Sequence, residues 1–473
     1  MVDSSPTEMQ QAFSASLKDK LNKAFSQQTN GNFETMSVPN GLYWGIQFGP
    51  NNYYNKNFLN QANLLAIRGS SGILTIGNDL FTGLYNNILG ATVFAWSQSD
   101  EKAMAQDNTN NQSQVQALIN GWETDMGKPI TQTLMDEAVP PTKLGYILGQ
   151  YVTKWASDPD KVPDAFPNFK PALLVYLAQA AISARLGTQA AALNARLKAA
   201  RANSLAGTAA NGGLQTSSDA YYLPLGPFPT QNKINSSLQT LTNKVSMNFK
   251  LENFSSKESR LSIEGKTGFT IPIFDFASIG VSGGAKYTVD KYASSSTVIN
   301  TDITYEGITF VEAPLTDANL TGDNKSGWYW NDGLSDAIRN VWTTGSNPAK
   351  TGLALHSTQY PVDEYFGSGK KFSKIKTWVL SQEPTIKMQF CGADASKIKT
   401  DFQQNSHIGV KLFGLIDIGS VDQSYKVTDV DDKSVAGCVT VTMGSTKTIG
   451  TTIDADARAY VVGGVPSYPP NNT

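Results

Sequence analysis

Hydrophobic residues in the N-terminal part of the chain are spaced for helices. In residues 6 to 28 a hydrophobic residue recurs at every fourth position, which predicts a helix with one apolar face. These residues are Met9, Phe13, Leu17, Leu21 and Phe25. Apolar stripes also predict helices at residues 142–156 and 171–205, and a polar residue or Pro at the start predicts helices at residues 100–126 and 129–138. Residues 1–205 are therefore predicted to form a mainly helical domain.

The pattern changes after this segment. Residues 206–235 contain Ala-Asn-Gly-Gly and Leu-Pro-Leu-Gly-Pro-Phe-Pro, and such Gly and Pro content breaks regular structure. We assign this stretch to a linker. Beyond it, hydrophobic and polar residues alternate, which is typical of half-buried antiparallel strands.

The strand-like part contains one pattern twice. Residues 247–251 match residues 386–390, and residues 268–280 match residues 407–419 at the same offset, with Phe274 opposite Phe413. Neither copy is large enough to cover its own apolar face, so we expect the two to close one core together. The alternative is independent β patterning without a repeat.

These boundaries give the expected domains. A first β unit occupies residues 236–315, an aromatic-rich insertion residues 316–380, a second β unit residues 381–465 and a tail residues 466–473. The predicted fold class is α+β and multidomain: a mainly helical N-terminal half followed by an antiparallel β-sandwich or barrel built from two repeated β units. Helices first and a β-rich binding part second is similar to the general layout of some bacterial insecticidal toxins, and no family motif accompanies it.

Composition limits which binding partners and which cellular compartment we expect for this protein. Lys plus Arg number 38 and Asp plus Glu 40, for a net charge of −2, so the whole chain carries no basic footprint for nucleic acid. Cys391 and Cys438 lie far apart in strand-like runs, and we expect free buried thiols, with a bridge between neighbouring strands as the alternative. The N-terminus shows no signal peptide. We expect synthesis in the cytoplasm, with release by a non-classical route as an option.

No catalytic, metal or cofactor site is predicted. The chain has two histidines, His356 and His407. His356 has no recognisable catalytic partner, and His407 occupies the repeat position of Gly268, so both are interpreted as structural. Asp429, Asp431 and Asp432 have a spacing that calcium sites use, but the glycine and final glutamate of an EF-hand loop are absent from the sequence. We interpret them as a solvated turn.

The candidate site is Trp328, Tyr329 and Trp330. Neighbouring side chains in an extended segment point to opposite sides, so we expect at least one of these rings to be exposed unless another layer covers it. Aromatic rings beside polar groups stack on sugars and sit at membrane interfaces. The three residues are the predicted ligand or membrane contact.

Together these features favour a non-catalytic, membrane-active or toxin-like protein with a helical module and a β-rich binding module. Its expected partners are a membrane surface or a glycan, with a homo-oligomer as a further option. Two alternatives stay open: a self-assembling structural protein, favoured by the low charge of 16%, and a soluble lectin-like binding protein.

Overall fold

The computed structural model describes most of the chain. The described residues are 6–36, 61–69, 72–207, 214–215, 221–222, 225, 229, 231–255, 258–272, 277–281, 286–288, 292, 294–315, 328–403, 408–412, 416–418, 425–446 and 459–470. Phe274, Phe413 and His407 lie outside them.

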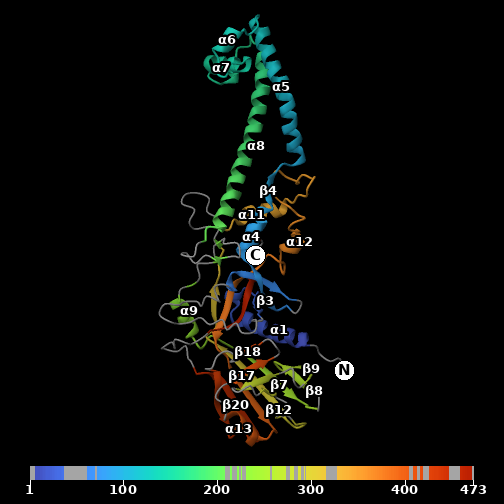
Figure 1. Ribbon diagram of the computed structural model, residues 1–473, viewed down its shortest axis with the longest axis vertical. Coiled ribbons are helices and arrows are strands. Elements are labelled where there is room, and N and C mark those ends of the chain that lie inside the picture. The colour runs from blue at the N-terminus through green and yellow to red at the C-terminus, as the bar shows by residue number, and fades with distance from the viewer. Residues whose placement is uncertain are drawn as a thin grey trace. The chain divides into compact units, whose positions relative to one another are not determined.

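The chain contains both helices and antiparallel sheets, which confirms the α+β class (Figure 1). It forms two compact units, and neither is a continuous half of the sequence. The sheet unit comprises Met1–Asn87, Asn203–Tyr329 and Val362–Thr473. The helical unit comprises Ile88–Ala202 and Trp330–Pro361.

This division differs from the predicted domains at 1–205 and 316–380. Strand β1 (Glu34–Thr35) pairs with β21 (Ala459–Ser467), so the start of the chain joins the sheet unit. Strand β14 (Gly352–Leu355) pairs with β4 (Thr92–Ala95), so part of the predicted insertion joins the helical unit. Both pairings link residues far apart in sequence, which local patterns do not encode.

A seven-stranded antiparallel sheet forms the main layer of the sheet unit. Its strands lie in the order β19 (Tyr425–Asp431), β20 (Cys438–Ser445), β16 (Thr385–Cys391), β12 (Val298–Glu306), β7 (Lys244–Glu252), β8 (Glu258–Ile263) and β9 (Lys266–Pro272). In β7 and β12 every second residue is buried, as expected of strands with one covered face.

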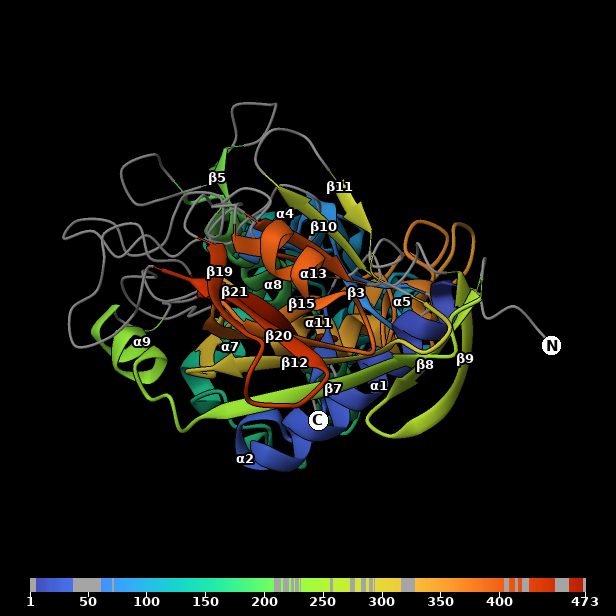
Figure 2. The ribbon, with the colours of Figure 1, turned by 90° about the horizontal axis from the view of Figure 1, so that it is seen from below.

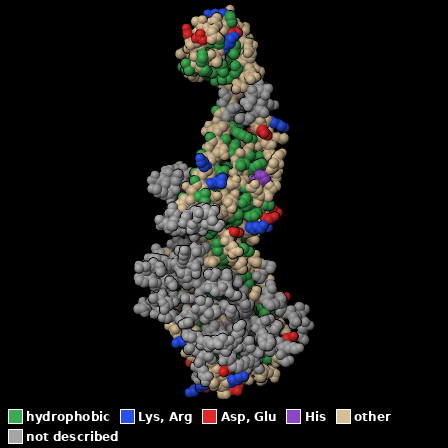
Figure 3. Space-filling view, in the orientation of Figure 1, with side chains coloured by type: hydrophobic (Ala, Val, Ile, Leu, Met, Phe, Trp, Pro, Cys, Tyr) green, Lys and Arg blue, Asp and Glu red, His purple; other side chains and the backbone are tan. Residues whose placement is uncertain are grey.

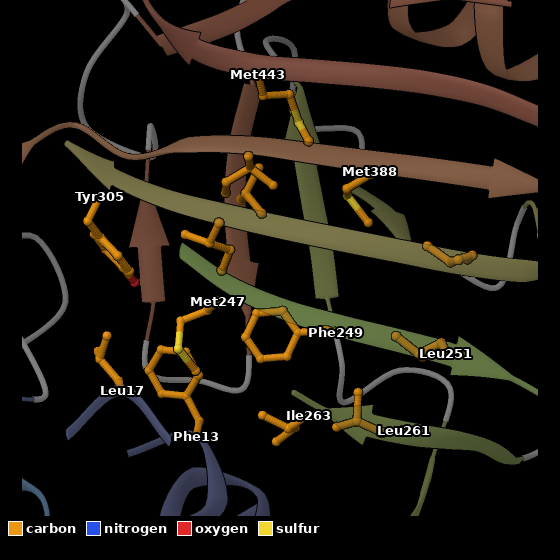
Figure 4. Packing of buried hydrophobic residues seen from close by; sticks show 14 of the residues in the cluster. Phe13, Leu17, Met247, Phe249, Leu251, Leu261, Ile263, Tyr305, Met388 and Met443 are labelled. Carbon is orange, nitrogen blue, oxygen red and sulfur yellow. The ribbon is translucent and has the colours of Figure 1, made fainter. Parts of the chain in front are cut away.

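Helix α1 (Pro6–Ala24) lies against this sheet, along β7 and β8 (Figure 2). Its predicted apolar face is confirmed, because Met9, Phe13, Leu17 and Leu21 are all buried. Phe13 stacks on Phe249 of β7, with ring centroids 5.8 Å apart. Figure 4 shows Phe13 and Leu17 facing Met247 and Phe249 across this core.

Cys391 and Cys438 form a disulfide, so the prediction of free thiols is wrong. The cause is the strand register: β16 and β20 pair antiparallel, and the two cysteines stand directly opposite each other at the end of the ladder. The sulfur atoms thereby come within bonding distance although 47 positions separate the residues.

Smaller sheets complete the sheet unit. One four-stranded sheet has the order β1, β21, β15 (Lys374–Gln382) and β13 (Thr309–Glu312), and another has β11 (Lys286–Thr288), β10 (Ala277–Val281), β17 (Ile408–Leu412) and β18 (Ile416–Ile418). A hairpin of β2 (Leu64–Arg68) and β3 (Leu74–Leu80) leads directly into α4 (Phe81–Gly90). The remaining short elements are α2 (Ser26–Thr29), β5 (Leu214–Gln215), β6 (Tyr221–Tyr222), α9 (Gln231–Leu238), α12 (Val362–Tyr365) and α13 (Ala395–Gln403).

The helical unit is built on two long helices, α5 (Gln98–Met126) and α8 (Phe169–Ser204), joined at one end through α6 (Gln132–Asp136), α7 (Lys143–Trp155) and η1 (Pro159–Lys161) (Figure 1). These bounds confirm the predicted helices to within a few residues. Trp122 packs against Phe169 with ring centroids 5.0 Å apart. A side chain at Gly121 would come within 2.8 Å of the Asn168 carbonyl oxygen, so glycine permits this close crossing. Helix α11 (Asn331–Arg339) belongs to the same unit.

Candidate functional site

Trp328, Tyr329 and Trp330 are buried, with 3%, 2% and 5% of their surfaces exposed. The sequence analysis expected an exposed ring unless another layer covers the cluster, and such layers cover all three rings. Helix α4 covers the first two: the Tyr85 ring lies 5.4 Å from Trp328 and 4.9 Å from Tyr329, centroid to centroid. In the helical unit, the Arg196 guanidinium lies 4.7 Å from the centre of the Trp330 ring. The rings thus offer almost no surface to a ligand or a membrane.

A cleft of about 1050 Å³ lies on the opposite face of α4, within the sheet unit. Three segments line it: the hairpin of β2 and β3, the outer face of α4, and residues 365–371. The lining residues are Leu65, Ala66, Ile67, Arg68, Asn78, Asp79, Leu80, Gly83, Leu84, Asn87, Tyr365, Gly369, Lys370 and Lys371.

The helical period of α4 separates its two faces. Phe81 and Tyr85, four residues apart, are buried against the aromatic core, whereas Gly83, Leu84 and Asn87 line the cleft. Residues at positions i and i+4 lie on one helix face, and the residues between them point elsewhere. Trp328 and Tyr329, two of the three residues predicted as the contact, pack against the buried face of this helix and so support one wall of the cleft.

Residues 365–371 are held by the same aromatic core. Phe372 stacks on Phe81 with ring centroids 4.6 Å apart, and Phe366 packs on Phe372 at 5.7 Å. Between these anchors Gly367 and Gly369 have φ angles of 109° and 75°, a region that favours glycine. The anchors fix both ends of a turn that carries Lys370 and Lys371 to the cleft.

Three of the four charged lining residues are cations. Arg68 forms an ion pair with Glu34, with 2.9 Å between nitrogen and oxygen, and Lys18 lies 3.8 Å from the same oxygen. Burial raises the pKa of the Glu34 carboxyl, and the neighbouring Arg68 and Lys18 partly offset this. Lys370 forms no ion pair with any residue that the structure describes. Asp79 is the one lining carboxylate.

Lys371 has two neighbours in the same segment. Its ammonium lies 2.8 Å from the Glu364 carboxylate and 5.0 Å from the centre of the Tyr365 ring. The hydrogen bond to Glu364 raises the pKa of Lys371. Because this side chain is more than half exposed, the ion pair contributes little to stability, and the ammonium remains accessible at the cleft.

The lining has an apolar side and a polar side. The apolar side includes Leu65, Ile67, Leu80 and Leu84, and the polar side carries amide and charged groups. Such a mixture of an apolar wall with a few polar groups is the usual composition of a small-molecule site. Its charged groups come from Arg68, Asp79, Lys370 and Lys371, and its hydroxyl group from Tyr365.

The other sequence candidates have structural roles. His356 is held by hydrogen bonds to Thr344 at 3.1 Å and Thr358 at 2.7 Å, and its ring packs on Trp342. In the acidic turn, Asp431 accepts two backbone N–H bonds within the turn, and Asp432 pairs with Lys399 at 2.8 Å. No cluster of three or more metal-ligating side chains occurs in the described part of the chain.

Sequence reasoning missed the cleft, because its residues come from two stretches nearly 300 positions apart whose contact depends on the tertiary fold. The one local signal was the Gly-rich run around Lys370 and Lys371.

Comparison with known proteins does not identify a family for this chain. No family model, curated protein or solved structure matches it.

Proposed function

We propose that this protein is a non-catalytic binding protein and that the cleft beside α4 holds its ligand. One observation carries the proposal: a cleft of about 1050 Å³, somewhat above the usual range for small-molecule sites, with one apolar wall, one polar wall and an aromatic core beneath. Burying a small organic molecule against such an apolar wall contributes about 25 cal/mol per Å² of apolar surface. Of the three classes of protein expected from the sequence, this proposal is nearest to the soluble lectin-like binding protein.

The test fills the cleft. Gly83 lies on the cleft face of α4, so Gly83→Trp is expected to abolish binding of compounds found by ligand-detected NMR in a panel of organic fragments and oligosaccharides. The matched control is Gly149→Trp, also in a helix and with open space around the glycine, which is expected to leave binding intact. If both variants keep the same bound compounds, the cleft is not the binding site.

A membrane-active function is a second proposal, and exposed apolar residues in the helical unit favour it. Val139 is 95% exposed, Val152 55% and Leu174 45%, and Figure 3 shows hydrophobic side chains gathered at the end of this unit that carries α6 and α7. Exposed apolar side chains of this kind insert into the interface of a bilayer. None of the described helices is both long and apolar enough to span a membrane, so contact at the interface is the form proposed.

Dye leakage from phosphatidylcholine vesicles tests this second proposal. Val139→Asp combined with Val152→Asp is expected to remove leakage, because a charge at each position opposes insertion. Exchange of two exposed residues of the sheet unit, Val435→Asp with Leu241→Asp, serves as the control. Absence of leakage with the unmodified protein excludes the membrane-active function.

We also propose the finer fold arrangement expected from the sequence, in which two repeated β units build the strand-rich part. The strand pairing supports it. Met247 stands opposite Ile303 in the first unit, and the matching Ile386 stands opposite Met443 in the second. Matching residues thus have matching partners in the two strand pairs, as duplication of one hairpin-like unit would produce.

The disulfide bears on location. Disulfides persist in oxidising surroundings and are rare in the cytosol, so we propose that the protein functions outside the cytoplasm after release. Mass spectrometry of alkylated protein from the native source tests this, because a reduced pair would take up two alkyl groups and contradict the proposal.

A further inference from the structure

We propose that the cleft takes an organic anion, whose apolar body lies on the leucine-lined wall and whose negative head group lies among Arg68, Lys370 and Lys371. This inference rests on the proposed binding function, since it names the ligand class of the same cleft. It specifies a carboxylate, sulfate, sulfonate or phosphate group carried on an apolar body. Arg68 comes from β2 and the two lysines from residues 365–371, so tertiary structure brings the three charges to one site.

The cations retain capacity for a ligand. The ion-pair partners of Arg68 and Lys371 are Glu34 and Glu364, and neither glutamate lines the cleft. A guanidinium has five N–H donors and an ammonium three, so a contact to one carboxylate leaves further donors on each side chain. Lys370 is exposed and forms no ion pair with a described residue, so its charge is not neutralised within the described structure.

The apolar wall determines that the anion is organic. Leu65, Leu80 and Leu84 line the cleft beside Ile67, which is 51% exposed. An inorganic ion would fill little of a cleft of about 1050 Å³ and would leave this wall in contact with water. An apolar body of naphthalene size or larger covers it and adds binding energy in proportion to the area removed from water.

Asp79 provides a test of the sign of the ligand's charge. It lines the same cleft and is exposed, so its carboxylate repels a bound anion. Removing that charge with Asp79→Asn is expected to tighten anion binding. Loss of folding cannot imitate such a gain, which keeps the test informative even where other variants are less stable.

The probes are naphthalene-2-sulfonate and naphthalene-2-sulfonamide, which have nearly the same shape. The first carries a permanent negative charge and the second is neutral near pH 7. By isothermal titration calorimetry the sulfonate is expected to bind about tenfold more tightly, as a charge-assisted hydrogen bond allows. Raising the salt concentration is expected to weaken sulfonate binding and leave the sulfonamide unchanged.

Charge removal completes the experiment. Lys370→Gln with Lys371→Gln is expected to weaken sulfonate binding about tenfold without affecting the sulfonamide, and Lys128→Gln with Lys161→Gln in the helical unit is the matched control. Equal affinity for the two probes, or sulfonate binding unchanged in both double variants, overturns the anion proposal. If Gly83→Trp still blocks binding in that case, the binding function stands without it. If Gly83→Trp blocks neither probe, the binding function itself fails.

Discussion

At the scale of single residues, Lys374 has an unusual environment for a lysine. It lies in β15, is 1% exposed, and its ammonium nitrogen donates a hydrogen bond to the Ala313 carbonyl oxygen. Burial lowers its pKa from 10.5 to about 7, and the nearby Lys376 adds to this effect. An amine taken from water into an apolar interior is costly in its charged form.

This pKa makes stability depend on pH. Below about pH 7 both the folded and the unfolded chain hold the Lys374 proton, so the full penalty for burying the charge applies. Between about pH 7 and 10.5 only the unfolded chain still holds it, so the free energy of unfolding rises with pH. We expect Lys374→Met to remove most of this rise in urea unfolding measured from pH 6 to 9.5. The exposed Lys387→Met is the control, and parallel pH profiles for Lys374→Met and the unmodified protein would contradict the assignment.

At the scale of elements, α4 connects the aromatic core with the cleft. Trp328→Ala removes a ring packed against Phe81 and Tyr85, and we expect the free energy of unfolding to fall by about 3–5 kcal/mol. Because α4 also forms a cleft wall, binding of the sulfonate probe should weaken as well. Trp330→Ala is the matched comparison: it removes an equally buried ring in the helical unit and should lower stability without changing cleft affinity. If both variants change the affinity for the probe equally, packing of Trp328 against α4 does not influence the cleft.

Local patterns predicted some elements and not others. Helix α1 and helix α8 follow from spacing and from flanking Pro and Gly residues, because those signals lie within the element itself. Helix α4 has no comparable signal, because Gly and Asn interrupt its apolar positions. The burial of Trp328 and the pairing of Cys391 with Cys438 depend on which distant segments become neighbours, and a single sequence contains no direct record of that.

At the scale of the whole molecule, the start of the chain is part of the strand-rich core. Phe13→Ala in α1 is expected to lower the free energy of unfolding by about 3–5 kcal/mol, because its ring stacks on Phe249 of β7. Amide hydrogen exchange should then quicken at Phe249 and Leu251 and stay unchanged in α7, which has a separate core. Gln11→Ala, on the exposed face of α1, is the control. Faster exchange in α7 and not in β7 would instead indicate that α1 packs with the helices, in a helical domain at residues 1–205.

The Cys391–Cys438 bond closes a covalent ring around α13, β17, β18 and β19. If the two ends of the oxidised protein were pulled apart, force would pass through the two sulfur atoms and bypass the segment of 47 positions between them. At roughly 3.3–3.6 Å per residue, the hidden length is about 160 Å. With the bond reduced, the same pull would also extend this segment, so the contour length gained in a force experiment would report the redox state of one molecule at a time.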